Sequence, residues 1–418
     1  MRHVILGAGP AGVIAAETIR KHAPNDEIVI VGDEPGAPYS RMAIPYLLMG
    51  NIGEAGTQLR HDPQHYAKLR IELRRARARA VDVAKRSLSM EDGSVLAFDA
   101  LLIATGSSPI RPPIPGMELP GVHSCWTLED ARAIMQLAVP GARVVQMGAG
   151  FIGCIILEAL AARGVHLTVV EMGDRMVPRM MGPTAGGMIK SWCEAQGVAV
   201  HTGTRVEAIE AGTPMRVRLS DGSQVAADLV ISATGVRPSI GFLENSGITC
   251  LLGVLTDEHL QTNVPGIYAA GDCAEAFDLA SQKMIVSAIQ PNAADQAVVA
   301  ALNMVGRKAR LKGVTQINVL DTLGLISTSF GDWQGVPGGE HVELTDRAAG
   351  RHLSLHFDGD VMVGCNSVGW TEHVGVMRGL VEGQVRLGPW KKELLADPTQ
   401  LMQAYLARAQ GQEAHAHV

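Results

Sequence analysis

The stretch Val4-Ile5-Leu6-Gly7-Ala8-Gly9-Pro10-Ala11-Gly12 lies near the start of the chain and decides its fold. Three apolar residues typical of a strand lead into a GxGxxG pattern, and the segment Val13 to His22 has the period of a helix. The first glycine permits a tight turn, the second lets the backbone approach a pyrophosphate, and the third allows the helix to pack closely on the strand. Because the N–H groups at a helix N-terminus favour an anion, this turn predicts a dinucleotide site at Gly7, Gly9, Pro10, Ala11 and Gly12.

The same pattern occurs a second time. The apolar run Arg143 to Met147 leads into Gly148-Ala149-Gly150-Phe151-Ile152-Gly153, which opens another helical segment. A strand, a glycine turn and a helix repeated in one chain indicate two parallel-sheet units of one nucleotide-binding design. The second site is expected to involve Gly148, Gly150, Phe151, Ile152 and Gly153.

An acidic residue ends the strand that follows each glycine turn. Asp33 and Glu34 come just after the strand Glu27 to Val31, and Glu171 lies 23 residues after the start of the second turn. A carboxylate in this place accepts hydrogen bonds from ribose hydroxyls, so we expect Asp33, with Glu34 beside it, and Glu171 to do so. Since a carboxylate repels a 2′-phosphate, Glu171 favours NAD(H) over NADP(H), and Arg175 is the one nearby residue that would weaken this preference.

The composition excludes several classes of protein. The chain has 418 residues, 47% of them hydrophobic and 19% charged, which is typical of a globular α/β protein and long enough for about three domains. A net charge of −6 argues against a dedicated nucleic-acid binder. The chain has no apolar run long enough to span a bilayer and no secretory signal at its start, so we expect a cytoplasmic protein.

Cysteine and histidine spacing gives no sign of a metal site. The six cysteines lie far apart with no CxxC pair, so we expect reduced thiols and neither zinc nor a cluster in this chain. His415 and His417 lie in a polar terminal stretch that we expect to fray and not to bind metal. The Arg-rich stretch Arg70 to Arg86 is interrupted by acidic residues; a solvated face is one interpretation, and a docking patch for an acidic partner is the other.

Three further strands end in short turn motifs. Leu101 to Gly106 and Val230 to Gly235 end in Ala-Thr-Gly, and Ile267 to Asp272 ends in Gly-Asp. From about Val314 onward, alternating apolar runs predict an antiparallel β meander followed by helices. The chain therefore has a third domain after the two nucleotide-binding units.

The set GxGxxG, ATG, GxGxxG, ATG and AAGD, in this order, resembles the flavoprotein pyridine-nucleotide reductase family, which includes glutathione, ferredoxin and rubredoxin reductases and FAD-containing nitrite reductases. The resemblance covers about residues 1–315. It implies an α/β fold with two Rossmann-like (FAD/NAD(P)-binding) domains plus a smaller α+β C-terminal domain. The implied FAD-binding domain comprises residues 1–108 and 240–315, the NAD-binding domain residues 109–239, and the C-terminal interface domain residues 316–418.

The resemblance also implies roles for individual residues. The first glycine turn would hold the FAD pyrophosphate, Asp33 the adenosine ribose and Asp272 the flavin ribityl chain. Arg41 matches a cofactor-contacting arginine of the ferredoxin-reductase and apoptosis-inducing-factor branch, with a surface ion pair as the alternative. A helix beginning near Ala294 would point its N-terminus at the flavin C2 carbonyl. The remaining implied contacts are Ala104, Thr105, Gly106 and Gly271 for FAD and Gly235 for NAD.

Several departures from the family pattern bear on the chemistry. Disulfide reductases of the family carry cysteines beside the flavin, but Met42 stands where single-cysteine relatives have theirs and cannot form a thiolate. Tyr46 and Ile155 occupy the positions of a Lys–Glu pair beside flavin N5 in the apoptosis-inducing-factor branch. We therefore expect no catalytic side chain, because the flavin itself would carry the chemistry. Phe151 would shield a ring of one cofactor or pack in the core.

The segment from Gly32 to Gly50 is similar to the family of FAD-binding epsilon subunits of phenylglyoxylate dehydrogenase. That family delivers electrons from 2-oxoacid oxidation to NAD. The resemblance implies a flavoprotein that exchanges a hydride with NAD(H) and single electrons with an iron–sulfur partner in a multisubunit complex. The alternatives are a stand-alone ferredoxin or rubredoxin reductase, an NADH oxidase or peroxide reductase, which Met42 disfavours, and a redox-sensing interaction protein like apoptosis-inducing factor.

The third domain contains most of the rare tryptophans. Trp333, Trp370 and Trp390 lie there, the last followed by Lys391 and Lys392. We predict that these residues contact an acidic iron–sulfur partner. The alternative is that the tryptophans form the core under a small sheet.

Overall fold

The computed structural model describes residues 1–413, so His415 and His417 lie outside the described residues. The chain forms two compact units. The first comprises residues 1–108 and 236–314, and the second comprises residues 109–235 and the chain from 315 onward. The N-terminal glycine turn is in the first unit and the Gly148 turn is in the second.

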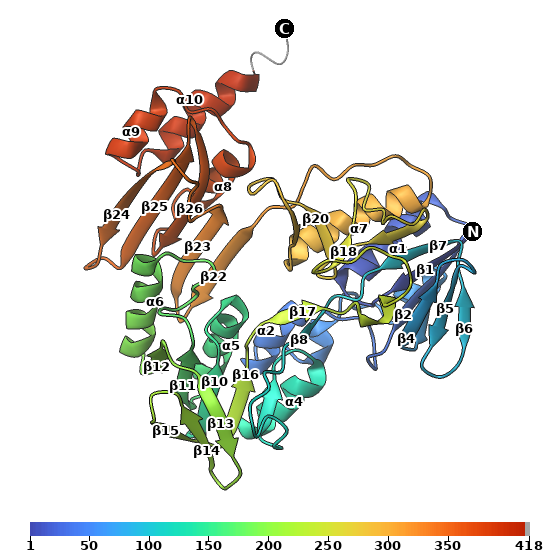
Figure 1. Cartoon of the computed structure of the whole chain (residues 1–418), viewed down its shortest axis with the longest axis horizontal. Coiled ribbons are helices and arrows are strands. Elements are labelled where there is room, and N and C mark those ends of the chain that lie inside the picture. Colours follow the sequence, from blue (N-terminus) through green and yellow to red (C-terminus); the bar gives the residue numbers. More distant parts are fainter. Residues whose placement is uncertain (414–418) are drawn as a thin grey trace. The chain divides into compact units, whose positions relative to one another are not determined.

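The first unit is built on a parallel five-stranded sheet in the order β19-β7-β1-β2-β3 (Figure 1). Successive side chains of a strand point to opposite faces. Ile5 of β1 therefore packs with helices α1 and α7, which lie side by side, whereas Val4 and Leu6 pack into the cluster on the other face. This confirms a Rossmann-like unit. Its elements are β1 (Arg2–Leu6), α1 (Pro10–His22), β2 (Glu27–Gly32), β3 (Ile71–Arg75), β7 (Ala100–Ile103), β19 (Ile267–Ala269) and α7 (Gln290–Met304).

Smaller elements complete the first unit. One antiparallel sheet comprises β4 (Ala78–Asp82), β5 (Ser87–Met90) and β6 (Val95–Ala97), and a second sheet comprises β18 (Val254–Leu255), β20 (Ala274–Phe277) and β21 (Met284–Val286). Strands β8 (Ser107–Pro109) and β17 (Val236–Pro238) pair with each other. The short helices are α2 (Ile44–Leu48) and α3 (His65–Lys68), with 3-10 turns η1 (Arg41–Ala43), η2 (Glu54–Thr57) and η3 (Gly241–Leu243).

The Arg-rich stretch along β3 and β4 carries acidic partners of its own. Arg74 pairs with Glu72 at 2.8 Å, and Arg77 lies 3.7 Å from Asp33 and 3.6 Å from Glu91. All of these side chains are at least one-third exposed. The pairing favours a solvated face over a docking patch.

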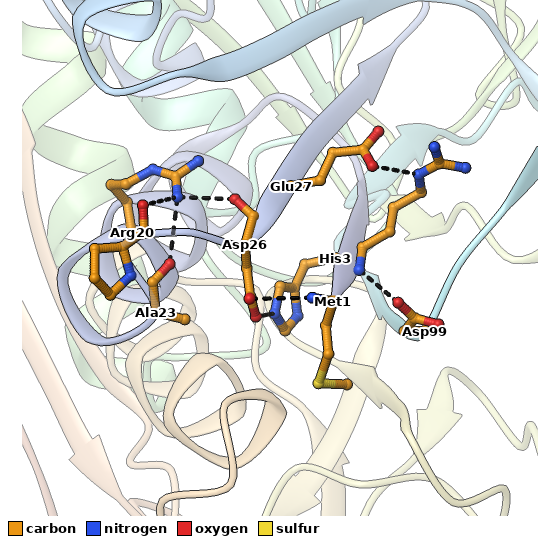
Figure 2. Close-up of polar contacts among 9 residues, drawn as sticks. Met1, His3, Arg20, Ala23, Asp26, Glu27 and Asp99 are labelled. Atoms are coloured by element: carbon orange, nitrogen blue, oxygen red, sulfur yellow. Dashed lines mark hydrogen bonds and ion pairs between the residues drawn. The ribbon is translucent and has the colours of Figure 1, made fainter.

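Figure 2 shows the polar contacts at the end of the first sheet opposite its glycine turn. The ring of His3 is fully buried, and its Nε2 lies 2.8 Å from Asp26 Oδ2, while the Met1 ammonium donates to Asp26 Oδ1 at 3.0 Å. The Arg20 guanidinium donates to three main-chain carbonyls just past α1, those of Ala23, Pro24 and Asp26. These bonds tie the end of α1 to the segment that leads into β2.

The second unit repeats the design with a parallel sheet in the order β12-β11-β10-β16-β9. Its elements are β9 (Val122–Ser124), α4 (Leu128–Leu137), β10 (Arg143–Met147), α5 (Phe151–Ala161), β11 (His166–Glu171), α6 (Pro183–Ala195), β12 (Ala199–Thr202) and β16 (Leu229–Ser232). Between β12 and β16 in the sequence, the chain forms a separate antiparallel sheet of β13 (Val206–Glu210), β14 (Met215–Leu219) and β15 (Gln224–Ala227).

The C-terminal part of the second unit is an antiparallel five-stranded sheet in the order β22-β23-β26-β25-β24, as the meander predicted. Asn366 ties it to the part before it, since its Oδ1 accepts from the Gly182 N–H at 2.9 Å and its Nδ2 donates to Met180 O at 2.8 Å. The elements are β22 (Ile317–Thr322), β23 (Leu325–Gly331), β24 (Glu340–Asp346), β25 (Arg351–Asp358), β26 (Val361–Val368), α8 (Val374–Glu382), α9 (Trp390–Ala396) and α10 (Leu401–Glu413).

The predicted partner contact in this C-terminal part is not supported by its packing. Trp370 and Trp390 pack against the core under the sheet, and Trp370 also lies beneath the Arg351 guanidinium. Lys391 forms an ion pair with Glu340 and is only 18% exposed, so its charge is neutralised within the chain. All three tryptophans are half-buried, Trp370 and Trp390 against this core, and of the two lysines Lys392 alone is exposed.

None of the helices in residues 1–413 combines the length and apolar character that a membrane crossing requires. Over the same residues, no group of three or more His, Cys, Asp or Glu side chains is placed to hold a metal ion.

Candidate functional site

The first glycine turn is packed so tightly that two of its glycines admit no side chain. Gly7 has a φ of +116°, and a Cβ there would lie 2.0 Å from the carbonyl oxygen of Ala104. A Cβ on Gly12 would lie 1.9 Å from the Gly7 oxygen, whereas one on Gly9 would meet nothing within 4 Å. Gly9 is thus the one with open space above it, at the N-terminus of α1, and this is the room that a pyrophosphate needs. The helix begins at Pro10, three residues before the predicted start, because proline suits the first helical position.

The other predicted FAD residues meet around this turn. Thr105 and Gly106 continue from Ala104, and Gly271 lies where a Cβ would be 3.4 Å from the Ala11 methyl carbon. The Asp272 carboxylate accepts a hydrogen bond from Ser107 Oγ at 2.9 Å. Burial raises the pKa of the Asp272 carboxyl, against the lowering effects of Ser107 and Arg41.

The two acidic residues after β2 differ in their surroundings. The Asp33 side chain is 53% exposed, with only Arg77 nearby at 3.7 Å. The Glu34 carboxylate instead accepts from the Tyr39 hydroxyl and from Arg41 Nη2, each at 2.5 Å. Arg41 also lies over the Tyr39 ring, 5.8 Å from its centre. Glu34 therefore fixes Arg41, and Asp33 is the carboxylate available to a ribose.

The second glycine turn repeats this packing. A Cβ on Gly148 would lie 2.4 Å from Ala233 O, in the second Ala-Thr-Gly turn that ends at Gly235, and one on Gly153 would lie 2.5 Å from Gly148 O. Gly150 has open space around it, like Gly9. Phe151 and Ile152 form the half-buried first turn of α5.

Glu171, the residue predicted to bind a ribose, is bound to the main chain of its own unit. It is 9% exposed, and its two carboxylate oxygens accept from the N–H groups of Ala149 and Gly173, each at 2.7 Å. Arg175, which would weaken a preference for NAD(H), donates to the carbonyls of Met181 and Pro178 and to Asp174. Among the described residues, Arg175 is thus engaged by its own segment and by the Asp174 carboxylate.

The departures from the family pattern lie in the first unit and in α5. Met42 is 48% exposed and Tyr46 54% exposed, and Ile155 is half-buried in α5. All six cysteines are free, and burial raises the pKa of every one of their thiols. Burial therefore disfavours the thiolate form of these cysteines.

Sequence reasoning missed three residues that shape these turns. Ser107 holds Asp272, Gln296 accepts from the Gly271 N–H at 2.6 Å, and Gln146 donates to the carbonyls of Gly148 and Gly153 at 2.9 Å. A polar residue inside an apolar strand is a signal that could have identified Gln146. The helix with Gln296 begins at Gln290, four residues before the predicted start near Ala294.

A family model described as pyridine nucleotide-disulphide oxidoreductase matches residues 1–300. The NADH-dependent phenylglyoxylate dehydrogenase subunit epsilon of Aromatoleum evansii is 30% identical, with 95% of each chain covered. An NADH oxidase of Methanocaldococcus jannaschii is 31% identical, with 88% of each covered. A chain of the covalent putidaredoxin reductase–putidaredoxin complex superposes with a TM-score of 0.89 at 25% identity, covering 97% of this chain and 98% of that one.

Proposed function

The chain belongs to the pyridine nucleotide-disulphide oxidoreductase family, and from this premise we propose that it exchanges a hydride with NAD(H) and single electrons with an iron–sulfur partner. The protein is an NAD(H)-dependent oxidoreductase with FAD and NAD(H) as cofactors. Bound flavin supplies the step from two-electron to one-electron chemistry, because a nicotinamide transfers two electrons and an iron–sulfur cluster accepts one.

FAD is assigned to the first unit. Gly9 leaves space above the N-terminus of α1, and Asp33 is exposed at the end of β2. Asp272 is held by a hydrogen bond from the Ser107 hydroxyl. The role of these residues is to bind and orient the dinucleotide, while Glu34 keeps Arg41 in place.

NAD(H) is assigned to the second unit, with Glu171 selecting against NADP(H). The buried Glu171 carboxylate has a second lone pair on each oxygen for ribose hydroxyls, and its charge would repel a 2′-phosphate. Arg175 donates to two carbonyls and pairs with Asp174, so these contacts hold its guanidinium within its own segment. The residues involved are Gly148, Gly150, Phe151, Ile152, Gly153, Glu171 and Gly235.

The partner is an iron–sulfur protein, and we assign the chain to the NAD-reducing subunit of a 2-oxoacid dehydrogenase complex of the phenylglyoxylate type. The observation that carries the first part is the absence of a reactive thiol among the described residues, together with Met42 in the place of the family cysteine. None of the described cysteines would then form a disulfide intermediate with the electrons of a bound flavin. The assignment to the complex is supported by similarity along 95% of the epsilon subunit.

Native purification followed by single-turnover kinetics tests both parts. We expect the chain to co-elute with subunits whose absorbance includes iron–sulfur features, and anaerobic NADH to bleach its flavin. Purification as an active monomer that reduces free ferredoxin or rubredoxin would replace the complex with a stand-alone reductase.

Two other outcomes would contradict the proposal. Oxygen consumption as fast as iron–sulfur reduction would favour an NADH oxidase, the activity named for the relative in Methanocaldococcus jannaschii. A stable charge-transfer complex with negligible turnover would favour a redox-sensing interaction protein.

A further inference from the structure

Gln296 is a buried amide with one half of its hydrogen-bonding capacity unused. It lies in the second turn of α7 and is 0% exposed. Its Oε1 accepts from the Gly271 N–H at 2.6 Å, but its Nε2 has no hydrogen-bond partner among the described residues. A buried donor without a partner is costly, so such a group in a native protein calls for an explanation.

We infer that Gln296 is a positioning residue for FAD, with Nε2 donating to an oxygen of the pyrophosphate–ribityl part of the dinucleotide. This inference rests on the assignment of FAD to the first unit. The group is a donor, and the phosphate and ribityl oxygens of FAD are acceptors, so the unsatisfied atom has the polarity that this ligand requires.

The position of the amide fits this role. The Gly271–Asp272 turn, to which Oε1 is bonded, lies between two helices: a Cβ on Gly271 would be 3.4 Å from that of Ala11 and 3.6 Å from that of Ala293. Ala11 is in the first turn of α1, directly after the glycine turn, and α1 packs along α7 (Figure 1). Because Nε2 and Oε1 share one carbon, the free donor lies at this junction.

The buried glutamine of the other unit makes the contrast clear. In Gln146 the Nε2 group is fully used by two carbonyls, and the atom without a partner is Oε1, an acceptor. An acceptor cannot bind a phosphate oxygen. Of the two buried glutamines, therefore, only Gln296 presents a donor that FAD would satisfy.

Replacing Gln296 tests the inference through FAD affinity. Gln296→Met removes donor and acceptor, and Gln296→Glu keeps the acceptor for Gly271 but, when ionised, removes the donor. We expect both variants to bind FAD about tenfold or more weakly than wild type at pH 8 when apo-protein is titrated with FAD. Gln296→Glu should regain affinity at acid pH, where the neutral carboxyl again carries a proton to donate.

Asn303 on the same helix supplies the matched control. Its amide bonds to the backbone of His259, Val299 and Ala309, so Asn303→Ala should lower the Tm of the apo-protein and leave the FAD dissociation constant of the folded protein unchanged. FAD affinities of Gln296→Met and Gln296→Glu equal to that of wild type at pH 8 would mean that Nε2 donates nothing to the dinucleotide, and that result would overturn the inference. Wild-type apo-protein that takes up no FAD would overturn the FAD assignment and this inference together.

Discussion

The two glycine turns share one backbone plan but are supported in different ways. In the first turn, the residue two positions before the initial glycine is Ile5. Its Cγ2 would lie 3.3 Å from a Cβ on Gly12. The second turn has Gln146 in that place, and its Nε2 bonds the carbonyls of Gly148 and Gly153. Apolar packing supports one turn and a buried amide the other, so equivalent substitutions should have different consequences in the two units.

The acidic residues differ in the same sense. Asp33 is half-exposed and interacts weakly with the protein, whereas Glu171 is buried and accepts two main-chain hydrogen bonds. One carboxylate is free for a ligand, and the other shapes the turn that binds the ligand. The carboxylate of the second turn is therefore part of the structure of that turn, whereas the carboxylate of the first turn is not.

Adding a methyl group to the third glycine of each turn should have the largest effect. A Cβ on Gly12 would lie 1.9 Å from a main-chain oxygen. A Cβ on Gly153 would lie 2.5 Å from the corresponding main-chain oxygen of the second turn. We expect Gly12→Ala to yield colourless protein without FAD. Gly153→Ala should stay yellow but be reduced by NADH at least about tenfold more slowly. Visible absorbance and stopped-flow reduction measure the two effects.

Gly187→Ala is the control for these variants, because a Cβ there meets nothing within 4 Å and the residue lies in helix α6. It should retain both FAD and the rate of reduction by NADH. Loss of FAD from Gly153→Ala would contradict the assignment of the two cofactors to separate units.

Removing the carboxylates should separate their roles. Glu171→Ala leaves the N–H groups of Ala149 and Gly173 without acceptors and removes the charge that opposes a 2′-phosphate. We expect kcat/KM for NADH to fall about tenfold or more, and the preference for NADH over NADPH to fall with it. Asp33→Ala should weaken FAD binding only a few-fold, since an exposed group gains less from each hydrogen bond.

An unchanged coenzyme preference in Glu171→Ala would show that another group excludes the 2′-phosphate. The comparison of the two carboxylates would be reversed if FAD affinity fell more in Asp33→Ala than kcat/KM for NADH falls in Glu171→Ala.

The glycine turns could be predicted from the sequence because their requirement is local. A Cβ on Gly7 or Gly148 collides with a neighbouring strand, and the spacing of the glycines encodes that collision directly. The parallel sheets followed from apolar runs of the right length. The antiparallel C-terminal sheet followed from alternation.

The partners of the polar residues could not be predicted in this way. Ser107 bonds Asp272 across 165 residues, and Gln296 bonds Gly271 across 25, so neither pair has a signal in local spacing. Spacing predicts that Lys391 contacts an acidic partner, because its actual partner Glu340 lies 51 residues away in the sequence. Spacing identifies where the backbone must turn, and only the tertiary fold decides which side chains satisfy each other.

Gln146→Ile would give the second turn the apolar support of the first. The change removes two hydrogen bonds to Gly148 and Gly153 but also the Oε1 atom without a partner. Because these terms oppose each other, we expect the free energy of unfolding to change by about 1 kcal/mol or less. The KM for NADH should rise a few-fold as the turn loosens, while FAD content stays at the wild-type level. A KM identical to wild type would mean that the amide is not needed to shape the turn.

The last prediction concerns the opposite ends of the same two strands, where β1 has His3 and β10 has Val144, each four residues before the first glycine. Burial lowers the pKa of the His3 imidazole, although Asp26 partly offsets it. Below the unfolded pKa of about 6.5 the unfolded chain therefore binds a proton that the native state resists, so stability is lost as the pH falls. His3→Val removes this term, and we expect the variant to lose less unfolding free energy than wild type between pH 7 and pH 5, by up to about 1.4 kcal/mol per pH unit.

The Asp26 carboxyl, whose pKa is lowered by His3 and the amino terminus, contributes only below about pH 4. Parallel slopes for the two proteins in urea unfolding would mean that folding does not lower the pKa of His3, because its imidazole then gains a proton as readily in the native state as in the unfolded chain.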